Sequence, residues 1–416
     1  MFKSMSSVVA QSLIKITLSI LSLKFVAYYM GPAGMMMYGQ IQSFAQIAGA
    51  TTSSVTSSGV VKFIAEKEHP RKEIISTALL LLFIYSIIIF IFFALGVNFA
   101  EGNIISKEWI TIYMMTPLGA LFIGGTNLVV SILNGEQDFK GYFVFSITNS
   151  FALSLLTIIL CYFLYQTGAM LSIVLSPLGA FFFSAIWVKK IRHMFVFSFS
   201  TLKNNKLIAS LLQYSFMAII SAVVVYGTQI YIRNLISINV SMASAGIWFS
   251  ATKLSEVYMG IVSVLFSSIL IPRYTIKKGN ALKEDIKLFF YIAMFLGFGL
   301  IAGVYLLSPF IISIIYGAEF KDAEKIIFLY SFGDALKIIT WVFLYVMISK
   351  QYVKIYLVYE IASSILYFLF CTYGLKLVGF ELMAIGYPLQ SFSSLILIIL
   401  WYYFVFNKMA ISNDSI

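Results

Sequence analysis

The sequence predicts an all-α polytopic membrane protein, with twelve transmembrane helices in two parallel six-helix bundles. The first observation is composition: of 416 residues, 61% are hydrophobic and 11% are charged, whereas a soluble domain is about 45–50% apolar and about 25% charged. The second is that the apolar residues gather in runs long enough to cross a bilayer. The third is that short matches relate the two halves. Composition alone excludes a soluble enzyme, a disordered chain and a disulfide scaffold.

A helix needs about 20 residues to cross the hydrocarbon, and twelve runs meet that requirement. They are residues 8–29, 39–61, 74–97, 110–133, 142–165, 169–188, 208–232, 243–271, 286–307, 324–348, 352–373 and 383–406. The second and eighth are the most polar. The first run lacks a convincing small-residue cleavage site, so we expect it to stay as a span rather than to act as a signal peptide.

The basic residues predict the orientation. The chain has 28 Lys and Arg against 17 Asp and Glu, and most of this positive charge lies between the apolar runs, so topology explains it better than nucleic acid does. One side holds Lys3, Lys62, Lys67, Arg71, Lys72, Lys140, Lys189, Lys190, Arg192, Lys203, Lys206, Arg273, Lys277, Lys278, Lys283, Lys287, Lys350, Lys354 and Lys408. The other side holds Lys107, Arg233, Lys321, Lys325 and Lys376. Both termini are therefore expected in the cytoplasm.

Three short matches suggest an internal duplication. Residues 33–34 resemble 245–246, residues 137–142 resemble 351–356, and residues 176–178 resemble 387–389. The offsets are nearly constant and the order is kept, which favours a repeat over chance similarity between apolar segments. Six spans in each half give the halves one orientation, so we expect an N-terminal bundle in 1–200 and a C-terminal bundle in 201–416. Parallel repeats occur in transporters, with the substrate site where they meet.

Ionisable residues inside the predicted spans are the main functional candidates, because each costs at least about 2.5–3.5 kcal/mol near the bilayer centre. They are Lys15, Lys24, Arg233, Lys253, Glu256, Asp334, Lys337 and Glu360. Lys15 and Lys24 are nine residues apart and point to opposite sides of a helix. We favour Lys24 for a central cavity, although Lys24 and Arg233 lie near span ends and have the alternative of reaching lipid headgroups.

The remaining charges fall into pairs, with one exception. Lys253 and Glu256 are three residues apart, as are Asp334 and Lys337, so each pair shares a helix face. Each pair either neutralises its own charge within the helix or lines a water-filled passage through the protein. Glu360 is isolated, so its partner is expected from another helix, as a structural salt bridge or as part of a proton-titrating site.

The second span carries three glutamines, Gln40, Gln42 and Gln46, among many Ser and Thr residues. Amides and hydroxyls suit sugar hydroxyls, and small polar residues also favour close helix packing. Metal and nucleophilic chemistry is not expected. The two cysteines lie in apolar runs, the two histidines lie in basic loops, and no nucleotide-binding motif occurs.

One element links these residues to a known family. The run 333–337 (Gly-Asp-Ala-Leu-Lys) is followed by Trp341, Tyr356 and Glu360, and Arg233 and residues 245–248 precede Glu256. With Lys15 and Lys24 before residues 31–34, this order resembles the Wzx-type O-antigen flippases of the multidrug/oligosaccharidyl-lipid/polysaccharide exporter superfamily. Some relatives have an uncharged residue at the position of Lys253. Relatives also carry an acid in this span, and here the acid is Glu256, whose longer side chain keeps the charge.

The resemblance implies two six-helix bundles in a V around a central cationic cavity, in the bacterial inner membrane. It implies an undecaprenyl-diphosphate-linked oligosaccharide as substrate, flipped by alternating access, with Lys24, Arg233 and Lys337 drawing in the diphosphate. No cofactor is expected, and the sequence leaves open coupling to a proton or sodium gradient. Membrane lipid is an expected partner, association with a polysaccharide polymerase and a chain-length regulator is a further hypothesis, and nucleic acid is not expected. The alternatives are an O-antigen polymerase or other membrane glycosyltransferase, a drug exporter of the same superfamily, and a lipid II flippase.

Overall fold

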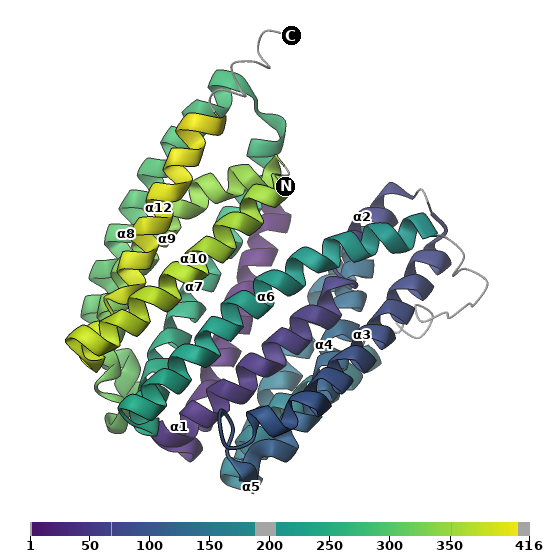
Figure 1. The fold of residues 1–416 in the computed structure, drawn as a ribbon. Helices are drawn as coiled ribbons and strands as arrows, with labels where there is room; N and C mark the ends of the chain where they lie inside the picture. Colours follow the sequence, from purple (N-terminus) through teal and green to yellow (C-terminus); the bar gives the residue numbers. More distant parts are fainter. Residues whose placement is uncertain (1, 68, 188–204, 351, 407–416) are drawn as a thin grey trace. The chain divides into compact units, whose positions relative to one another are not determined.

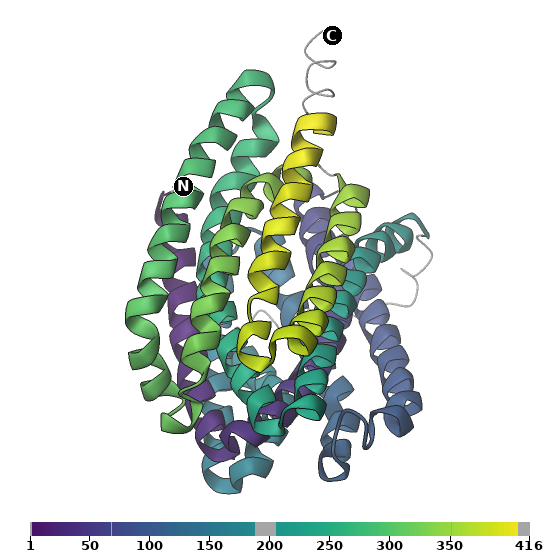
Figure 2. The same ribbon diagram turned by 60° about the vertical axis from the view of Figure 1, so that its left-hand side comes forward.

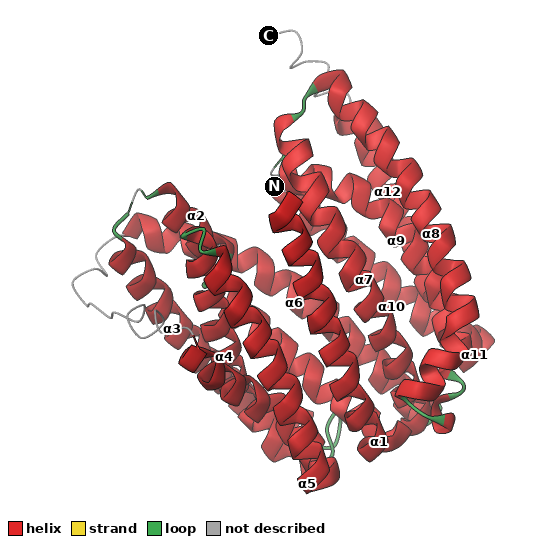
Figure 3. Cartoon of the chain, turned by 180° about the vertical axis from the view of Figure 1, so that it is seen from behind, coloured by secondary structure: helices red, strands yellow, loops and turns green. Residues whose placement is uncertain are grey.

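The computed structural model describes residues 2–67, 69–187, 205–350 and 352–406, and this part of the chain is almost entirely helical, without a β-strand (Figures 1 and 3). The predicted all-α class is confirmed. Ten helices within the described residues are long and apolar enough to cross a membrane. The chain divides into two compact units, unit 1 (Met1–Ile230) and unit 2 (Tyr231–Ile416).

Unit 1 contains five helices and the first part of a sixth. They are α1 (Phe2–Ser54), α2 (Ser58–Glu66), α3 (Arg71–Ala100), α4 (Ile110–Gly135), α5 (Phe139–Trp187) and α6 (Asn205–Asn239). Helix α1 packs against α4 and α5, and α2 and α3 pack against α4. The apolar core beneath α2 and α3 includes Ile74, Leu82, Leu128, Ile132 and Phe145.

Two of the long helices contain a break. Helix α1 loses helical geometry at Gly31 (φ 60°), immediately before Pro32, because proline disfavours the α conformation of the residue before it and glycine accepts a positive φ. Helix α5 breaks at Tyr165 (φ 52°). The first break falls between the predicted spans 8–29 and 39–61, and the second falls at the end of 142–165. The total of twelve crossings in two bundles stays a prediction.

Unit 2 contains the end of α6 and the remaining helices (Figure 2). They are α7 (Met242–Ile276), α8 (Gly279–Ile315), α9 (Ala323–Ser349), α10 (Val353–Val378), α11 (Phe380–Met383) and α12 (Gly386–Trp401). Helix α9 is the centre of the unit, since it packs against α7, α8 and α12. The apolar core around it includes Val342 of α9 itself and Phe266, Leu270, Phe289 and Ile398 of the helices packed against it.

Three hydroxyl groups of the second predicted span, those of Thr52, Ser53 and Thr56, are used in helix packing. Thr52 Oγ1 donates to the Ala120 carbonyl (2.7 Å), Thr56 Oγ1 donates to the Gly124 carbonyl (3.1 Å), and Asn127 Nδ2 donates to Ser53 Oγ. These bonds join the end of α1, and the short connection that follows it, to α4, which is the role that small polar residues have between membrane helices. The packing interpretation therefore holds for these hydroxyls.

Part of the orientation argument concerns residues that the structure does not describe. Lys189, Lys190, Arg192, Lys203, Lys408 and His193 lie outside the described residues, as do the C-terminus and the predicted boundary at 200/201. The cytoplasmic placement of both termini and the division into bundles 1–200 and 201–416 stay predictions.

Candidate functional site

Asp334, in the middle of α9, is the best-coordinated acid of the predicted set. It is 1% exposed. Its carboxylate accepts hydrogen bonds from Ser255 Oγ (2.6 Å), Tyr258 Oη (2.5 Å) and Tyr387 Oη (2.9 Å). A carboxylate in apolar surroundings needs such partners, because an unsatisfied charge there is very costly. Asp334 thus ties together α7, α9 and α12.

Lys337 lies one turn further along α9 and, unlike Asp334, is exposed. Its ammonium nitrogen lies 5.9 Å from the ring centroid of Tyr387, within range of a cation–π interaction. Tyr387 therefore serves both members of the predicted pair, since its hydroxyl bonds Asp334 and its ring faces Lys337. The arrangement keeps the acid inside the unit and leaves the ammonium group accessible.

Aromatic rings hold Tyr387 in place. Tyr330 stacks on it with ring centroids 4.4 Å apart and an interplanar angle of 17°. The hydroxyl of Tyr330 is hydrogen-bonded to that of Tyr367, and Trp248 packs edge-on against Tyr330 at 5.4 Å. Gly333 makes room for the Tyr387 ring, because a β-carbon at this position would lie 2.5 Å from Tyr387 Cδ1. This explains the glycine of the Gly-Asp-Ala-Leu-Lys element.

A second charged cluster joins α6 and α7. Lys253 Nζ and Glu256 Oε2 are 2.9 Å apart, as their spacing predicts, with the two side chains 20% and 41% exposed. The charge of Glu256 also acts on Arg233. Arg233 is 2% exposed, and its guanidinium carbon lies 5.3 Å from the Phe249 ring centroid. One carboxylate is therefore influenced by two cations, one buried and one half-buried.

The partner of Glu360 corrects one expectation. Its carboxylate accepts a hydrogen bond from Tyr356 Oη at 3.0 Å, so the hydrogen-bonding partner found among the described residues lies on its own helix. The four-residue spacing puts both side chains on one face of α10. Glu360 is half-buried, and the tyrosine hydroxyl provides hydrogen bonding without neutralising the charge.

A polar network that the sequence analysis missed fastens α10 to α12. Gln390 Nε2 donates to Ser363 Oγ (2.5 Å) and Ser394 Oγ (2.9 Å), and Ser394 Oγ donates to Ser363 Oγ (3.0 Å). Gln390 is one turn from Tyr387 on α12, so the network fixes the helix that carries this tyrosine. The available signal was an amide and several serines within the predicted spans 352–373 and 383–406.

The candidates from the first half all lie in unit 1. Lys24 and Gln46 are exposed and Gln42 is half-buried. The neighbouring Gln40, which is fully buried, donates to the Ile230 carbonyl at 3.2 Å. Unit 2 brings together Arg233 with Glu256 and Lys253, and Asp334 with Lys337. The part played by Lys24, Gln42 and Gln46 stays a prediction.

Long apolar helices, with buried charges held by hydroxyl groups and aromatic rings, define a multi-pass membrane protein. The chain belongs to the polysaccharide biosynthesis protein family, whose sequence profile matches residues 35–325. Over 374 residues it is 24% identical to the lipid III flippase of Escherichia coli (strain K12), a match covering 87% of this chain and 88% of that protein. The lipid III flippase of Shigella flexneri gives the same values.

Solved structures share the fold. The lipid II flippase MurJ in an inward closed conformation superposes with a TM-score of 0.71 and 17% identity, covering 97% of this chain and 87% of MurJ. An inward-facing multidrug resistance MATE family transporter of the MOP superfamily gives a TM-score of 0.69 and 16% identity, covering 94% and 97%. The resemblance to the exporter superfamily found from the sequence is confirmed.

Proposed function

We propose that this protein is a flippase that moves an undecaprenyl-diphosphate-linked oligosaccharide, an O-antigen repeat unit, from the cytoplasmic to the periplasmic leaflet of the bacterial inner membrane. The observation that carries the proposal is the similarity to the lipid III flippases over most of both chains. The same family membership places the chain in polysaccharide biosynthesis. The cations within its apolar helices fit a substrate whose headgroup is anionic.

Lys337 is the residue that best fits recognition of the diphosphate. Its ammonium group is accessible and is held over the Tyr387 ring. Ammonium–phosphate hydrogen bonds are charge-assisted and roughly twice as strong as neutral ones. The polyprenyl tail stays in lipid, so the protein needs to shelter only the headgroup. In this proposal Lys24 also attracts the diphosphate, and Gln42 and Gln46 contact the sugars.

Arg233 meets the substrate at another stage of an alternating-access cycle. It is buried against Phe249 and under the influence of Glu256. An arriving diphosphate competes with Glu256 for Arg233 and Lys253, and the exchange of partners accompanies the movement of α6 and α7. Glu256, Asp334 and Glu360 are the candidates for coupling this cycle to a proton or sodium gradient. Both termini lie in the cytoplasm in this proposal, and a polymerase and a chain-length regulator act on the flipped unit.

The test is to delete the gene in its native host and to extract the lipid-linked sugars. We expect single undecaprenyl-linked units to accumulate on the cytoplasmic leaflet, and the intact gene to clear them. If single units reached the periplasmic leaflet but were not joined into chains, the protein would be a polymerase and the proposal would be wrong. Transfer of the single units by the deletion strain at the wild-type rate would also contradict the proposal.

A drug exporter is the second candidate, because the fold is shared with multidrug resistance MATE family transporters. The exposed ammonium group of Lys337 argues against cationic drugs as substrates, since like charges repel. The deletion strain distinguishes the two functions. Deletion of a flippase leaves susceptibility to a panel of cationic dyes and antibiotics unchanged when the envelope is intact, whereas deletion of an exporter raises it.

A further inference from the structure

The end of α7, the start of α8 and the junction of α9 with α10 carry a concentration of positive charge that the proposed function does not use. The segments 273–287 and 350–354 contain seven basic residues and two acidic ones. Contacts bring these segments together: Lys350 Nζ donates to the Lys277 carbonyl at 2.9 Å, and Lys277 reaches back to Asp285 on α8. We name this surface the helix-end patch. Its basic members are Arg273, Lys277, Lys278, Lys283, Lys287, Lys350 and Lys354.

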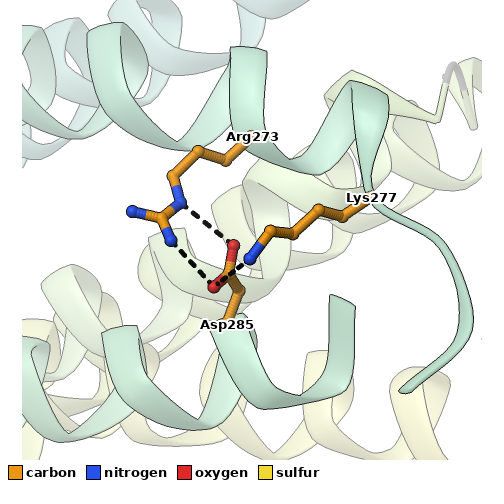
Figure 4. Close-up of polar contacts among 3 residues, drawn as sticks. All are labelled: Arg273, Lys277 and Asp285. Atoms are coloured by element: carbon orange, nitrogen blue, oxygen red, sulfur yellow. Dashed lines mark hydrogen bonds and ion pairs between the residues drawn. The ribbon is translucent and has the colours of Figure 1, made fainter. Parts of the chain in front are cut away.

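Asp285 organises the patch without neutralising it (Figure 4). Its carboxylate accepts two hydrogen bonds from Arg273, each 3.0 Å, and one from Lys277 of 2.8 Å. One negative charge thus fixes two positive ones. The Asp285 side chain is 6% exposed, while those of Arg273 and Lys277 are 44% and 36% exposed. Arg273 also lies over the Phe289 ring at 5.4 Å, so both cations are held in place and remain accessible.

Lys350 lies beside Lys278, because its Nζ donates to the carbonyl of Lys277, the residue before Lys278, at 2.9 Å. Burial and then the charge of Lys278 lower the pKa of Lys350. Among the described residues, no carboxylate pairs with either lysine. Two ammonium groups held near each other attract an anion that can bind both, and a phosphate group presents several oxygens for this purpose.

Apolar residues beside the cations indicate where that phosphate comes from. Ile276, between Arg273 and Lys277, is 80% exposed, and Leu288 and Tyr291 on α8 are 50% and 58% exposed. Apolar side chains next to snorkelling cations suit the boundary between acyl chains and headgroups. Binding of an acidic soluble protein to the cations would not account for these exposed apolar side chains. All seven cations also lie on the side that the sequence predicts to be cytoplasmic, where anionic lipid is available.

We infer that the helix-end patch binds the headgroup of an anionic phospholipid, with Lys278 and Lys350 on its phosphate and Ile276 among its acyl chains. This inference does not depend on which substrate the protein flips. The bound lipid contacts α7, α8 and the end of α9, which are helices that also carry the Lys253–Glu256 pair and Asp334.

The experiment is native mass spectrometry of the purified full-length protein in detergent, with added palmitoyl-oleoyl phosphatidylglycerol or the matched phosphatidylcholine. We expect the wild type to retain phosphatidylglycerol in preference to phosphatidylcholine. Each basic residue near an anionic surface raises affinity about fivefold, so the double variant Lys278→Gln/Lys350→Gln should bind phosphatidylglycerol about 30-fold more weakly. Lys278→Arg/Lys350→Arg should bind normally.

The matched control is Lys321→Gln/Lys325→Gln, which removes two exposed charges just before α9 and from its first turn and should leave lipid retention unchanged. If the Lys278→Gln/Lys350→Gln protein fails to fold, salt titration of the wild type replaces it, with retention of phosphatidylglycerol falling as salt rises. Equal retention of the two lipids by the wild type, or equal losses in the two glutamine variants, would overturn the inference. Because the readout is binding and not transport, failure here leaves the proposed flippase function standing.

Discussion

Replacing Gly333 with alanine tests the packing on which Asp334 and Lys337 depend. A β-carbon at Gly333 lies 2.5 Å from Cδ1 and 2.7 Å from Cε1 of Tyr387, and 3.1 Å from the backbone nitrogen of Pro388. Carbon atoms in contact are about 3.5–4.0 Å apart, so α12 must retreat by about 1 Å or the Tyr387 ring must turn. Either movement takes the 2.9 Å bond between Tyr387 and Asp334 beyond the normal range of about 2.5–3.0 Å.

The sign of the change in the free energy of unfolding shows whether α9 and α12 are closely packed at Gly333. Alanine is a better helix former than glycine by about 0.8–1.0 kcal/mol, so the substitution stabilises a helix that has room for it. Overpacking costs about 1–3 kcal/mol, and a lost hydrogen bond between membrane helices costs about 0.6 kcal/mol on average and up to about 1.7 kcal/mol. The balance predicts that Gly333→Ala lowers the free energy of unfolding by about 1–4 kcal/mol.

The assay is reversible unfolding of the purified protein in mixed micelles with increasing dodecyl sulfate. Gly303→Ala on α8 is the matched control, because no described atom lies within 4 Å of the added carbon. The control should be as stable as the wild type or more stable. A Gly333→Ala protein that matched or exceeded the wild type in stability would refute the close approach of α9 and α12.

Three further substitutions separate structure from transport. Asp334→Asn replaces an acceptor oxygen by a donor facing hydroxyl donors, so unfolding should become easier by about 1–3 kcal/mol in the same titration; unchanged stability would show that the hydroxyl contacts contribute nothing. Thr52→Val should cost about 0.6–1.7 kcal/mol through the lost bond to α4, whereas Thr17→Val, at an exposed hydroxyl bonded within its own helix, should cost less. Lys337→Gln should keep normal stability and slow transport about 10- to 100-fold, because a charged hydrogen bond to phosphate contributes about 1.5–3 kcal/mol; normal transport by this variant would remove Lys337 from the site.

Local features of this protein were predictable from its sequence. The helical class follows from composition and from the length of the apolar runs. The Lys253–Glu256 ion pair follows from helical spacing alone, since residues three apart share a face. Both are properties of one segment at a time, which is why periodicity was sufficient.

The surroundings of Asp334 were not predictable in this way. Its hydroxyl donors on α7 and α12 are brought to it by packing between helices, and spacing along the chain does not encode that packing. Tyr387 entered the sequence analysis only through a repeat match, and nothing there indicated that its ring would lie under Lys337. The expectation that Glu360 has its partner on another helix was wrong for the opposite reason. Its partner Tyr356 is four residues away on the same face of α10, so the contact is local.

The most direct test of the account is transfer across a bilayer by the purified protein. Proteoliposomes carry a fluorescent polyprenyl-diphosphate oligosaccharide, and a membrane-impermeant quencher reports how much of it has changed leaflet. We predict rapid transfer with the wild type, slowing of about 10- to 100-fold in Lys337→Gln, and recovery of most of the rate in Lys337→Arg. Equal rates in protein-containing and protein-free vesicles would contradict the flippase function, and equal rates in the wild type and Lys337→Gln would contradict recognition of the diphosphate by this ammonium group.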